Sequence, residues 1–145
     1  MLMDGRRSRN LIVMKAETME FSDVTGGAFD LGRMCPVILD ALPVVVTITD
    51  LEGCILYFNK YSQQILNRKP EYIGRDIRRC HKEADSIAKI DHILREFKKG
   101  GISEFYYEAS RAGTDFAVTV RPLKKEGQVL GCIHSVVIIK KNVGG

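Results

Sequence analysis

Residues 44–59 limit what this chain can fold into, because they predict a β-hairpin. Every residue in 44–49 is β-branched and residues 54–58 are apolar or aromatic, a composition typical of strands. Between the two runs, residues 50–53 are rich in turn formers, and Gly53 can take the positive φ that closes such a turn. Two apolar strands need other elements to cover them, so we expect the flanking sequence to supply those elements.

A helix is predicted immediately before the hairpin. Asp30 is a candidate N-cap, and Pro43 ends the segment. Pro36 restricts this helix to starting near it or kinking there. Apolar residues recur along it at spacings of three and four: Leu31, Met34, Ile38 and Leu42. We expect this apolar stripe to form the contact of a homodimer. The reason is that the long helix predicted below, over residues 86–99, already covers the inner face of the predicted sheet.

Two further helices are predicted after the hairpin. Asn59 can cap a short helix over residues 60–68, and residues 70–74 indicate a turn or a single helical turn. The clearest helix covers residues 86–99 and ends at two glycines. At about 100° per residue, its apolar side chains fall on one side and His92 falls on the opposite, polar side. These apolar side chains are Ile90, Ile93, Leu94 and Phe97.

Three strands are predicted in the C-terminal part of the chain, over residues 102–110, 115–120 and 129–139. The last is the longest and is apolar on both faces, which predicts a central position in its sheet. Two strands, short helices, one long helix and three strands together indicate a single α+β domain.

Length and composition fit one globular domain. With 145 residues, 45% of them hydrophobic, the core needs no disulfide or metal. Four cysteines form no Cys-x-x-Cys pair, and no apolar run suits a signal peptide or a membrane helix, so we expect a cytoplasmic protein with reduced thiols and no membrane contact. The net charge of +4 is too small to favour direct nucleic-acid binding. We expect a flexible or partner-bound arm over residues 1–29, the domain over residues 30–141 and a tail over residues 142–145.

Four short motifs in a fixed order resemble the PAS family, and the resemblance spans residues 39–139. They are Asp50-Leu51-Glu52-Gly53 followed by a strand and Asn59, Pro70-Glu71-Tyr72-Ile73-Gly74-Arg75, Arg111-Ala112-Gly113-Thr114 between two strands, and Glu126-Gly127-Gln128-Val129-Leu130-Gly131. The resemblance implies a five-stranded antiparallel sheet with helices over one face. It also implies a sensory or dimerisation module in signal transduction and transcription regulation.

Family members often enclose a small-molecule pocket between the sheet and the long helix. For this chain, the resemblance implies a lining formed by Phe58, Ile77, Ile90, Leu94, Tyr107, Phe116, Val118 and His134. Residues 74–81, Gly-Arg-Asp-Ile-Arg-Arg-Cys-His, are also similar to a PAS subgroup with a Cys-His-Pro sequence before the long helix. Lys82 stands where that subgroup has proline.

The identity of a cofactor stays open at this point. Flavin is not expected, because the flavin-binding photosensors of the family carry an Asn-Cys-Arg-Phe-Leu-Gln sequence that this chain lacks. Haem is an alternative with one histidine as axial ligand. The haem-sensing members take that ligand from the long helix, which indicates His92 by position, and His81 is the second candidate. No other metal site is expected.

We expect a regulatory module rather than an enzyme. Cys80 and His81 could form a nucleophile and its base, but adjacent side chains diverge and no third orienting group is evident. A bound small molecule would alter the contact of the homodimer or of an effector protein or domain. The alternative is a ligand-free dimerisation or protein-interaction module with a filled core. For His134, the alternative is a buried neutral histidine that a neighbouring strand or tyrosine satisfies.

Overall fold

The computed structural model describes residues 29–141. The expected tail and all but the last residue of the expected N-terminal arm lie outside these residues. The chain divides into two units, Met1–Pro36 and Val37–Gly145, and the second contains the sheet and the helices that cover it.

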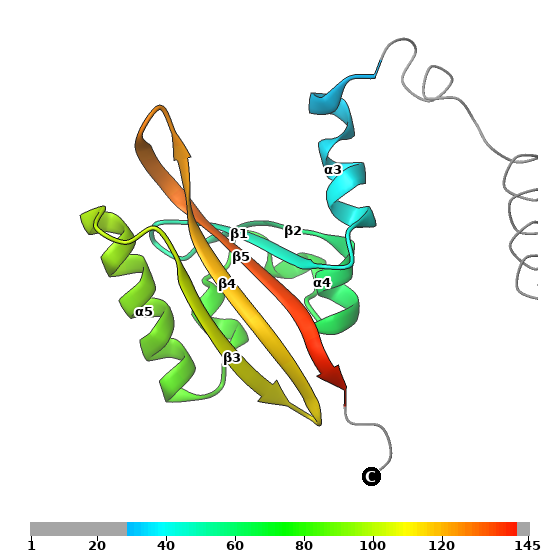
Figure 1. The fold of residues 1–145 in the computed structure, drawn as a ribbon, viewed down its shortest axis with the longest axis vertical. Helices are drawn as coiled ribbons and strands as arrows, with labels where there is room; N and C mark the ends of the chain where they lie inside the picture. The colour runs from blue at the N-terminus through cyan, green and yellow to red at the C-terminus, as the bar shows by residue number, and fades with distance from the viewer. Residues whose placement is uncertain (1–28, 142–145) are drawn as a thin grey trace, which may run out of the picture. The chain divides into compact units, whose positions relative to one another are not determined.

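Five strands form one antiparallel sheet in the order β2-β1-β5-β4-β3, which confirms the expected fold (Figure 1). β5 is the longest strand and lies at the centre of the sheet, as its apolar sequence predicts. In the turn between β1 and β2, Gly53 has the predicted positive φ, at 93°. The bounds are β1 (Val45–Asp50), β2 (Ile55–Phe58), β3 (Phe105–Arg111), β4 (Thr114–Lys125) and β5 (Gln128–Lys141).

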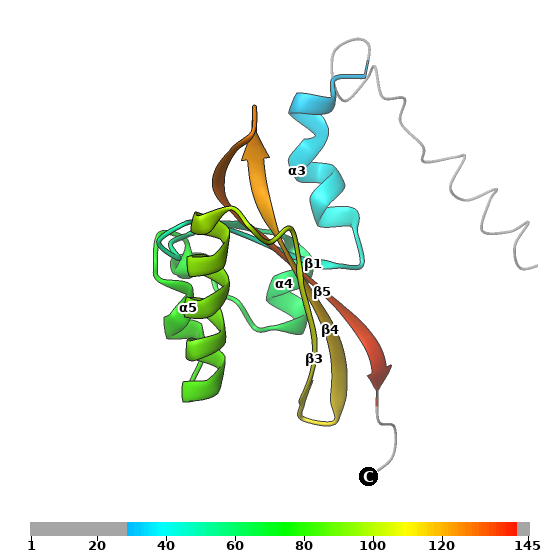
Figure 2. The same cartoon turned by 60° about the vertical axis from the view of Figure 1, so that its left-hand side comes forward.

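Helices cover one face of this sheet (Figures 1 and 2). They are α4 (Lys60–Ile65), α5 (Ala84–Lys99) and two 3₁₀ helices, η1 (Pro70–Tyr72) and η2 (Ile77–Cys80). The four predicted apolar side chains of α5 are buried in the core, and Gly100 ends the helix with a φ of 80°. None of the helices within the described residues is long and apolar enough to span a membrane.

The segment after α4 differs from the prediction. α4 ends at Ile65 rather than at Arg68. Asn67 has a φ of 53°, in the left-handed region that asparagine enters more readily than most residues. Asn67 turns the chain, so the Arg68 side chain is buried in the domain instead of lying on a helix surface.

β4 also extends beyond its predicted end at Val120 and continues to Lys125. This extension includes Pro122, which has no N–H to donate to a neighbouring strand. β3 pairs with β4 only between the pairs Arg111–Thr114 and Phe105–Val120. Beyond Val120, β4 therefore has a strand neighbour on one side only, and an edge of this kind tolerates proline.

α3 (Leu31–Ala41) contains Pro36 in its interior, so the helix does not start at this proline. Asp30 caps the helix as predicted, because its Oδ1 accepts a hydrogen bond from the backbone N–H of Arg33 at 3.2 Å. None of the side chains of α3 is buried. Of the predicted apolar stripe, Leu31, Ile38 and Leu42 are exposed and Met34 is half-buried.

Asn59 ties the end of α3 to the hairpin and is fully buried. Its Nδ2 donates to the carbonyl oxygens of Leu39 at 2.7 Å and Val44 at 2.8 Å. Its Oδ1 accepts from the backbone N–H groups of Val46 at 3.0 Å and Ser62 at 3.2 Å. The predicted cap of α4 is confirmed, and the same side chain also joins α3 to β1.

Candidate functional site

The inner face of the sheet, which α5 covers, carries a row of side chains that mixes apolar and polar groups. The sheet register places Thr47 between Phe58 and His134, and it places Val120 on the other side of His134. Thr47 is fully buried and His134 is 8% exposed. This central row, Phe58-Thr47-His134-Val120, therefore puts a hydroxyl and an imidazole in the middle of an apolar core.

All eight predicted lining residues lie at this core. Seven are buried, and Tyr107 is half-buried and packs against them, with the ammonium of Lys89 4.0 Å from the centre of its ring. They are Phe58, Ile77, Ile90, Leu94, Tyr107, Phe116, Val118 and His134. The structure brings this set together, and its role in binding stays a prediction.

Four polar atoms in this part of the chain are buried without a hydrogen-bond partner among the described residues. They are Thr47 Oγ1, Thr49 Oγ1, Arg68 Nε and His134 Nε2. Most buried polar groups in proteins are satisfied, and each one that is not costs roughly 1–3 kcal/mol. One alternative inferred from the sequence is that a neighbouring strand or tyrosine forms a hydrogen bond with the His134 ring. For the Nε2 atom of this ring, that alternative is wrong.

Arg68 is the least usual of these groups, because it is a cation that is only 8% exposed. Burial lowers the pKa of its guanidinium; the sulfur of Cys80 opposes this effect and the charge of Arg111 adds to it. Within residues 29–141, no carboxylate lies at ion-pair distance from Arg68. Buried charges in proteins are normally paired, so this guanidinium lacks the usual partner.

Two histidines share these positive surroundings. Burial, followed by the charge of Arg68 and the neighbouring His81, lowers the pKa of His134 from 6.5 to about 4. Burial, followed by the charges of Arg68 and Arg111, lowers the pKa of His81 from 6.5 to about 4. Both rings are therefore neutral at neutral pH, which leaves their nitrogen atoms free to donate or accept hydrogen bonds.

Acidification is expected to destabilise the domain through His134. The pKa of this ring is about 4 in the folded chain against a usual value of 6.5, so between these values the unfolded chain binds a proton that the folded chain does not. The free energy of unfolding should fall by roughly 3 kcal/mol for this group as the pH drops across that interval. Urea unfolding at a series of pH values measures the effect.

Two matched variants test the assignment to His134. His134→Gln removes one of the two rings whose pKa is lowered to about 4, the other being His81, and should reduce this pH dependence by about half. His92→Gln makes the same change at an exposed position of α5 and should leave the profile as it is. A profile of unchanged steepness in His134→Gln would show that another group causes the effect.

The two candidate haem ligands lie in different surroundings. His92 is exposed on the polar side of α5 as predicted, and its ring lies edge-on to Phe105 with the ring centres 5.5 Å apart. His92 therefore does not fit as the axial ligand of a haem in the core. His81 is half-buried and acts electrostatically on His134. Within the described residues, no group of three or more metal-ligating side chains occurs.

The sequence pattern did not identify Arg68, Thr47 and Thr49 as groups of this core. A signal for Arg68 was present, since the preceding Asn67 is a residue type that commonly ends a helix in the left-handed conformation. The two threonines follow the buried Val45 at spacings of two, which places all three on one face of β1. Their lack of partners depends on the tertiary structure.

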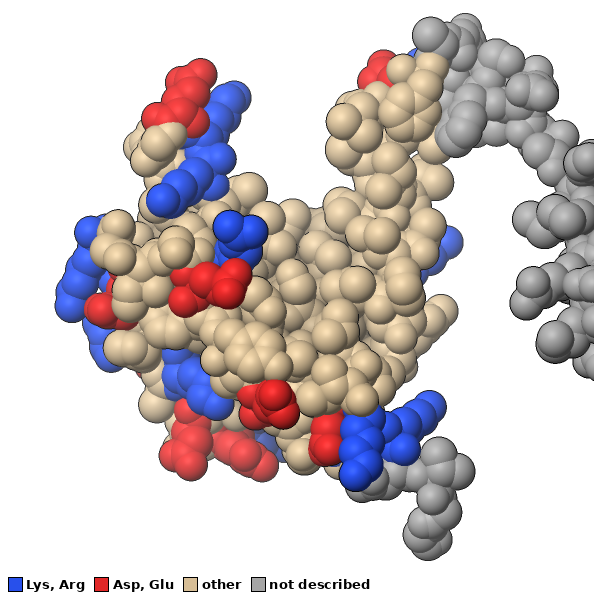
Figure 3. Space-filling view, viewed as in Figure 1, with Lys and Arg blue, Asp and Glu red and all other residues tan. Residues whose placement is uncertain are grey.

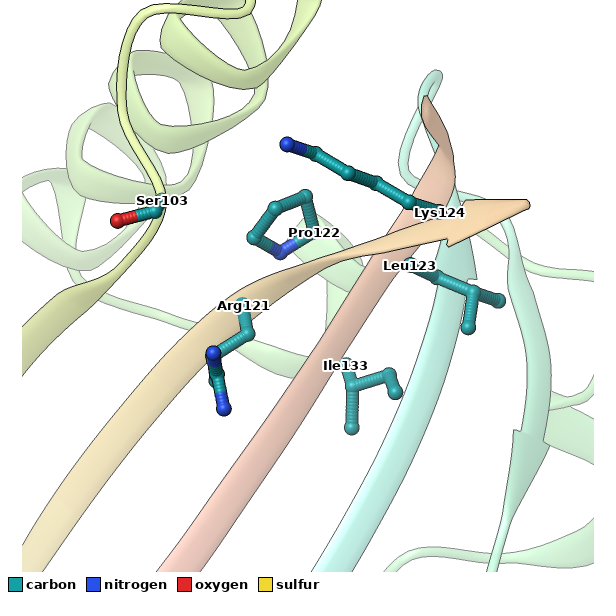
Figure 4. A pocket seen from close by; sticks show the side chains of 6 residues that line it. All are labelled: Ser103, Arg121, Pro122, Leu123, Lys124 and Ile133. Carbon is teal, nitrogen blue, oxygen red and sulfur yellow. The ribbon is translucent and has the colours of Figure 1, made fainter. Parts of the chain in front are cut away.

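An open depression of about 380 Å³ lies where β4 extends past the end of β3. Figure 4 shows its lining side chains, Ser103, Arg121, Pro122, Leu123, Lys124 and Ile133. Figure 3 shows charged side chains at the tip of the β4–β5 hairpin and a broad uncharged area over β1 and β5. The depression includes none of the predicted lining residues of the core.

Solved structures with a similar fold come from several organisms. The C-terminal domain of a protein from Streptococcus mutans is 19% identical with a TM-score of 0.64, over 79% of this chain and 92% of that one. The PAS domain of a protein from Colwellia psychrerythraea is 20% identical with a TM-score of 0.60, over 76% and 98%. The PAS domain of the quorum-sensing receptor RpfR from Cronobacter turicensis, solved in complex with BDSF, is 20% identical with a TM-score of 0.53, over 68% and 96%.

A comparison of the sequence with models of protein families agrees with the similarity of the fold to solved PAS domains. No curated protein matches this sequence. A family model described as a PAS domain matches residues 36–140, which include every strand and the central row apart from the last residue of β5. Because this model covers most of the chain, the chain belongs to the PAS domain family.

Proposed function

We propose that this PAS domain is a cytoplasmic sensory module that binds a small molecule between the inner face of the sheet and α5. The central row carries the proposal, because Thr47 and His134 hold polar atoms there that no described protein group satisfies. A ligand with polar groups would satisfy them, and the surrounding apolar side chains would contact its body. The BDSF complex of the RpfR PAS domain shows that one similar fold accommodates a ligand. The proposal assigns the domain no catalytic role.

The same core is linked to α3 by hydrogen bonds. Phe58 of the central row is followed by Asn59, whose Nδ2 donates to the carbonyl oxygen of Leu39 in α3. Asp40 of α3 accepts hydrogen bonds from the backbone N–H of Lys60 at 2.9 Å and from the hydroxyl of Tyr57 at 3.3 Å. A ligand that displaces Phe58 would therefore move the groups that hold the end of α3, which makes α3 the proposed output element.

Ligand binding is tested by thermal unfolding with a panel of haem, flavins, fatty acids and small neutral, acidic and basic molecules. A compound that binds only the folded chain raises the melting temperature with its concentration. At least one class of the panel should do so, and Val118→Trp, which fills the core beside the central row, should reduce that rise. No rise with any compound would contradict the proposal.

The proposed output is a homodimer through α3. Leu31, Val37, Ile38 and Leu42 are all exposed in the single chain. Ile38→Glu with Leu42→Glu should convert the dimer to a monomer in sedimentation experiments without changing the melting temperature of the monomer. Ile73→Glu changes an exposed apolar residue outside α3 and serves as the control. A chain that is monomeric at high micromolar concentration would rule out this contact.

A second function is favoured by a different observation, the uncharged outer area of the sheet. Large apolar side chains are exposed on the strands, including Leu56, Tyr106, Leu130 and Ile139. In this alternative, the core holds no ligand and the domain acts only by docking a partner or a second copy. Concentration-dependent association together with no ligand response would favour this function over the first.

A further inference from the structure

We propose that the ligand of this core is an anion, and that a carboxylate of a small organic molecule binds to Arg68, with His134 and Thr47 as further hydrogen-bond donors. This inference rests on the function proposed above, because it names the chemical class of ligand for the same core. It starts from three side chains that are each more than nine-tenths buried and each hold an unsatisfied polar atom.

The backbone fixes Arg68 in this position. Asn67 turns the chain with a φ of 53°, and the Arg68 N–H donates to the carbonyl oxygen of Ser62 at 3.5 Å. The Ser62 hydroxyl in turn donates to the carbonyl oxygen of Val46 at 3.2 Å. Val46 precedes Thr47, so one chain of hydrogen bonds runs from Arg68 through α4 to the strand that carries the central row.

The three side chains can all act as donors, and this property selects the ligand. The guanidinium of Arg68 has N–H groups only and matches a carboxylate with two parallel hydrogen bonds. The hydroxyl of Thr47 can rotate to donate, and neutral His134 donates from Nε2 in one of its two tautomers. An anion would accept from all three and would supply the opposite charge that Arg68 lacks. A cationic ligand would instead be repelled.

Two arginines make the electrostatic surroundings of this site positive. Arg111 is exposed, His81 is half-buried and Arg68 is buried. Arg111 acts electrostatically on both His81 and Arg68, and no aspartate or glutamate is among the groups that act on Arg68, His81 or His134. Positive charge that no carboxylate offsets attracts ligands of the opposite sign. These electrostatic surroundings therefore favour an anion.

The first test compares carboxylates with uncharged analogues of the same shape on the whole chain. Acetate, butyrate and hexanoate are matched with acetamide, butyramide and hexanamide in thermal unfolding and calorimetry, with inorganic phosphate and chloride as further probes. At least one carboxylate should bind at least about tenfold more tightly than its amide. Equal binding of acid and amide, or a response to phosphate or chloride alone, would overturn the assignment of a carboxylate.

The second test makes the same substitution at two arginines. Arg68→Met should weaken carboxylate binding by about 100-fold, and the melting temperature without ligand should stay the same or rise, because an unpaired buried charge is removed. Arg78 is paired, with its Nε 2.6 Å from Asp91 Oδ1 and its Nη1 3.0 Å from Asp76 Oδ1. Arg78→Met should therefore lower the melting temperature but keep the response to carboxylates.

The outcomes separate this inference from the proposed function. If Arg68→Met unfolds the chain, or folds and keeps the full response to carboxylates, Arg68 is a structural residue and the inference is wrong. If neutral compounds of the panel bind and carboxylates do not, the inference fails while the proposed function stands. If no compound of any charge binds, the proposed function fails as well.

Discussion

Replacing Asn59 with alanine is expected to lower the free energy of unfolding by roughly 4 kcal/mol. The Asn59 side chain is fully buried and bonds to four backbone groups, of which the carbonyl oxygens of Leu39 and Val44 accept from its Nδ2. Alanine would leave these carbonyls and the N–H of Val46 without partners, and each unsatisfied buried group carries its own cost. Urea unfolding followed by circular dichroism measures the loss.

A matched control and a second readout sharpen this test. Gln63→Ala also removes an amide, but at an exposed position of α4, and should change the stability by less than about 0.5 kcal/mol. Because Asn59 also holds Leu39 of α3, amide hydrogen exchange in the last turn of α3 should become faster in Asn59→Ala. A stability change as small as that of Gln63→Ala would contradict the role given to Asn59.

Asn59 also shows which part of a polar side chain the sequence can predict. Its position before a short helix predicts a cap, and its Oδ1 does accept from the N–H of Ser62. Its bonds to Leu39 and Val44 join segments that are far apart in the sequence, so no local pattern predicts them. The sequence therefore indicates the local half of the interaction and not the half that connects the core to α3.

Periodic elements were predicted well, because apolar spacing reports directly on burial. The buried face of α5 followed from this spacing, and the central place of β5 followed from a strand that is apolar on both faces. The length of β4 did not, because Pro122 is tolerated only where β3 has already ended, and that is a property of the whole sheet. Local signals fixed the type of these elements, and their neighbours fixed the ends.

The polar groups of the core could not be predicted in this way. The burial of Arg68 depends on the turn at Asn67, and the lack of partners for Thr47 and His134 depends on how the helices close over the sheet. An apolar core without these groups would be more stable, since each unsatisfied atom has a cost. Natural proteins accept such losses mainly where function needs them, which is why these residues, rather than the apolar lining, distinguish a binding core from a filled one.

Replacing Gly131 with alanine is expected to lower the free energy of unfolding by more than about 3 kcal/mol. Gly131 lies in β5 opposite Asp50 of β1, and a Cβ at this position would overlap the carbonyl oxygen of Thr49. The overlapping atom belongs to the backbone of the paired strand, so the clash cannot be relieved by a change of side-chain rotamer. β1 would have to move away from β5 next to the pair Thr49–Cys132, and Thr47 of the central row would move with it.

Gly101→Ala is the matched control for Gly131→Ala, because a Cβ at Gly101 would meet no atom within 4 Å. Its free energy of unfolding should change by less than about 0.5 kcal/mol. Any Gly131→Ala protein that still folds should also show a weaker response to the ligand found in the panel, since Thr47 would lie farther from His134 of the paired strand. Equal stability of Gly131→Ala and Gly101→Ala would mean that β1 and β5 tolerate a wider separation. The close approach of their two backbones would then not be needed to place the central row.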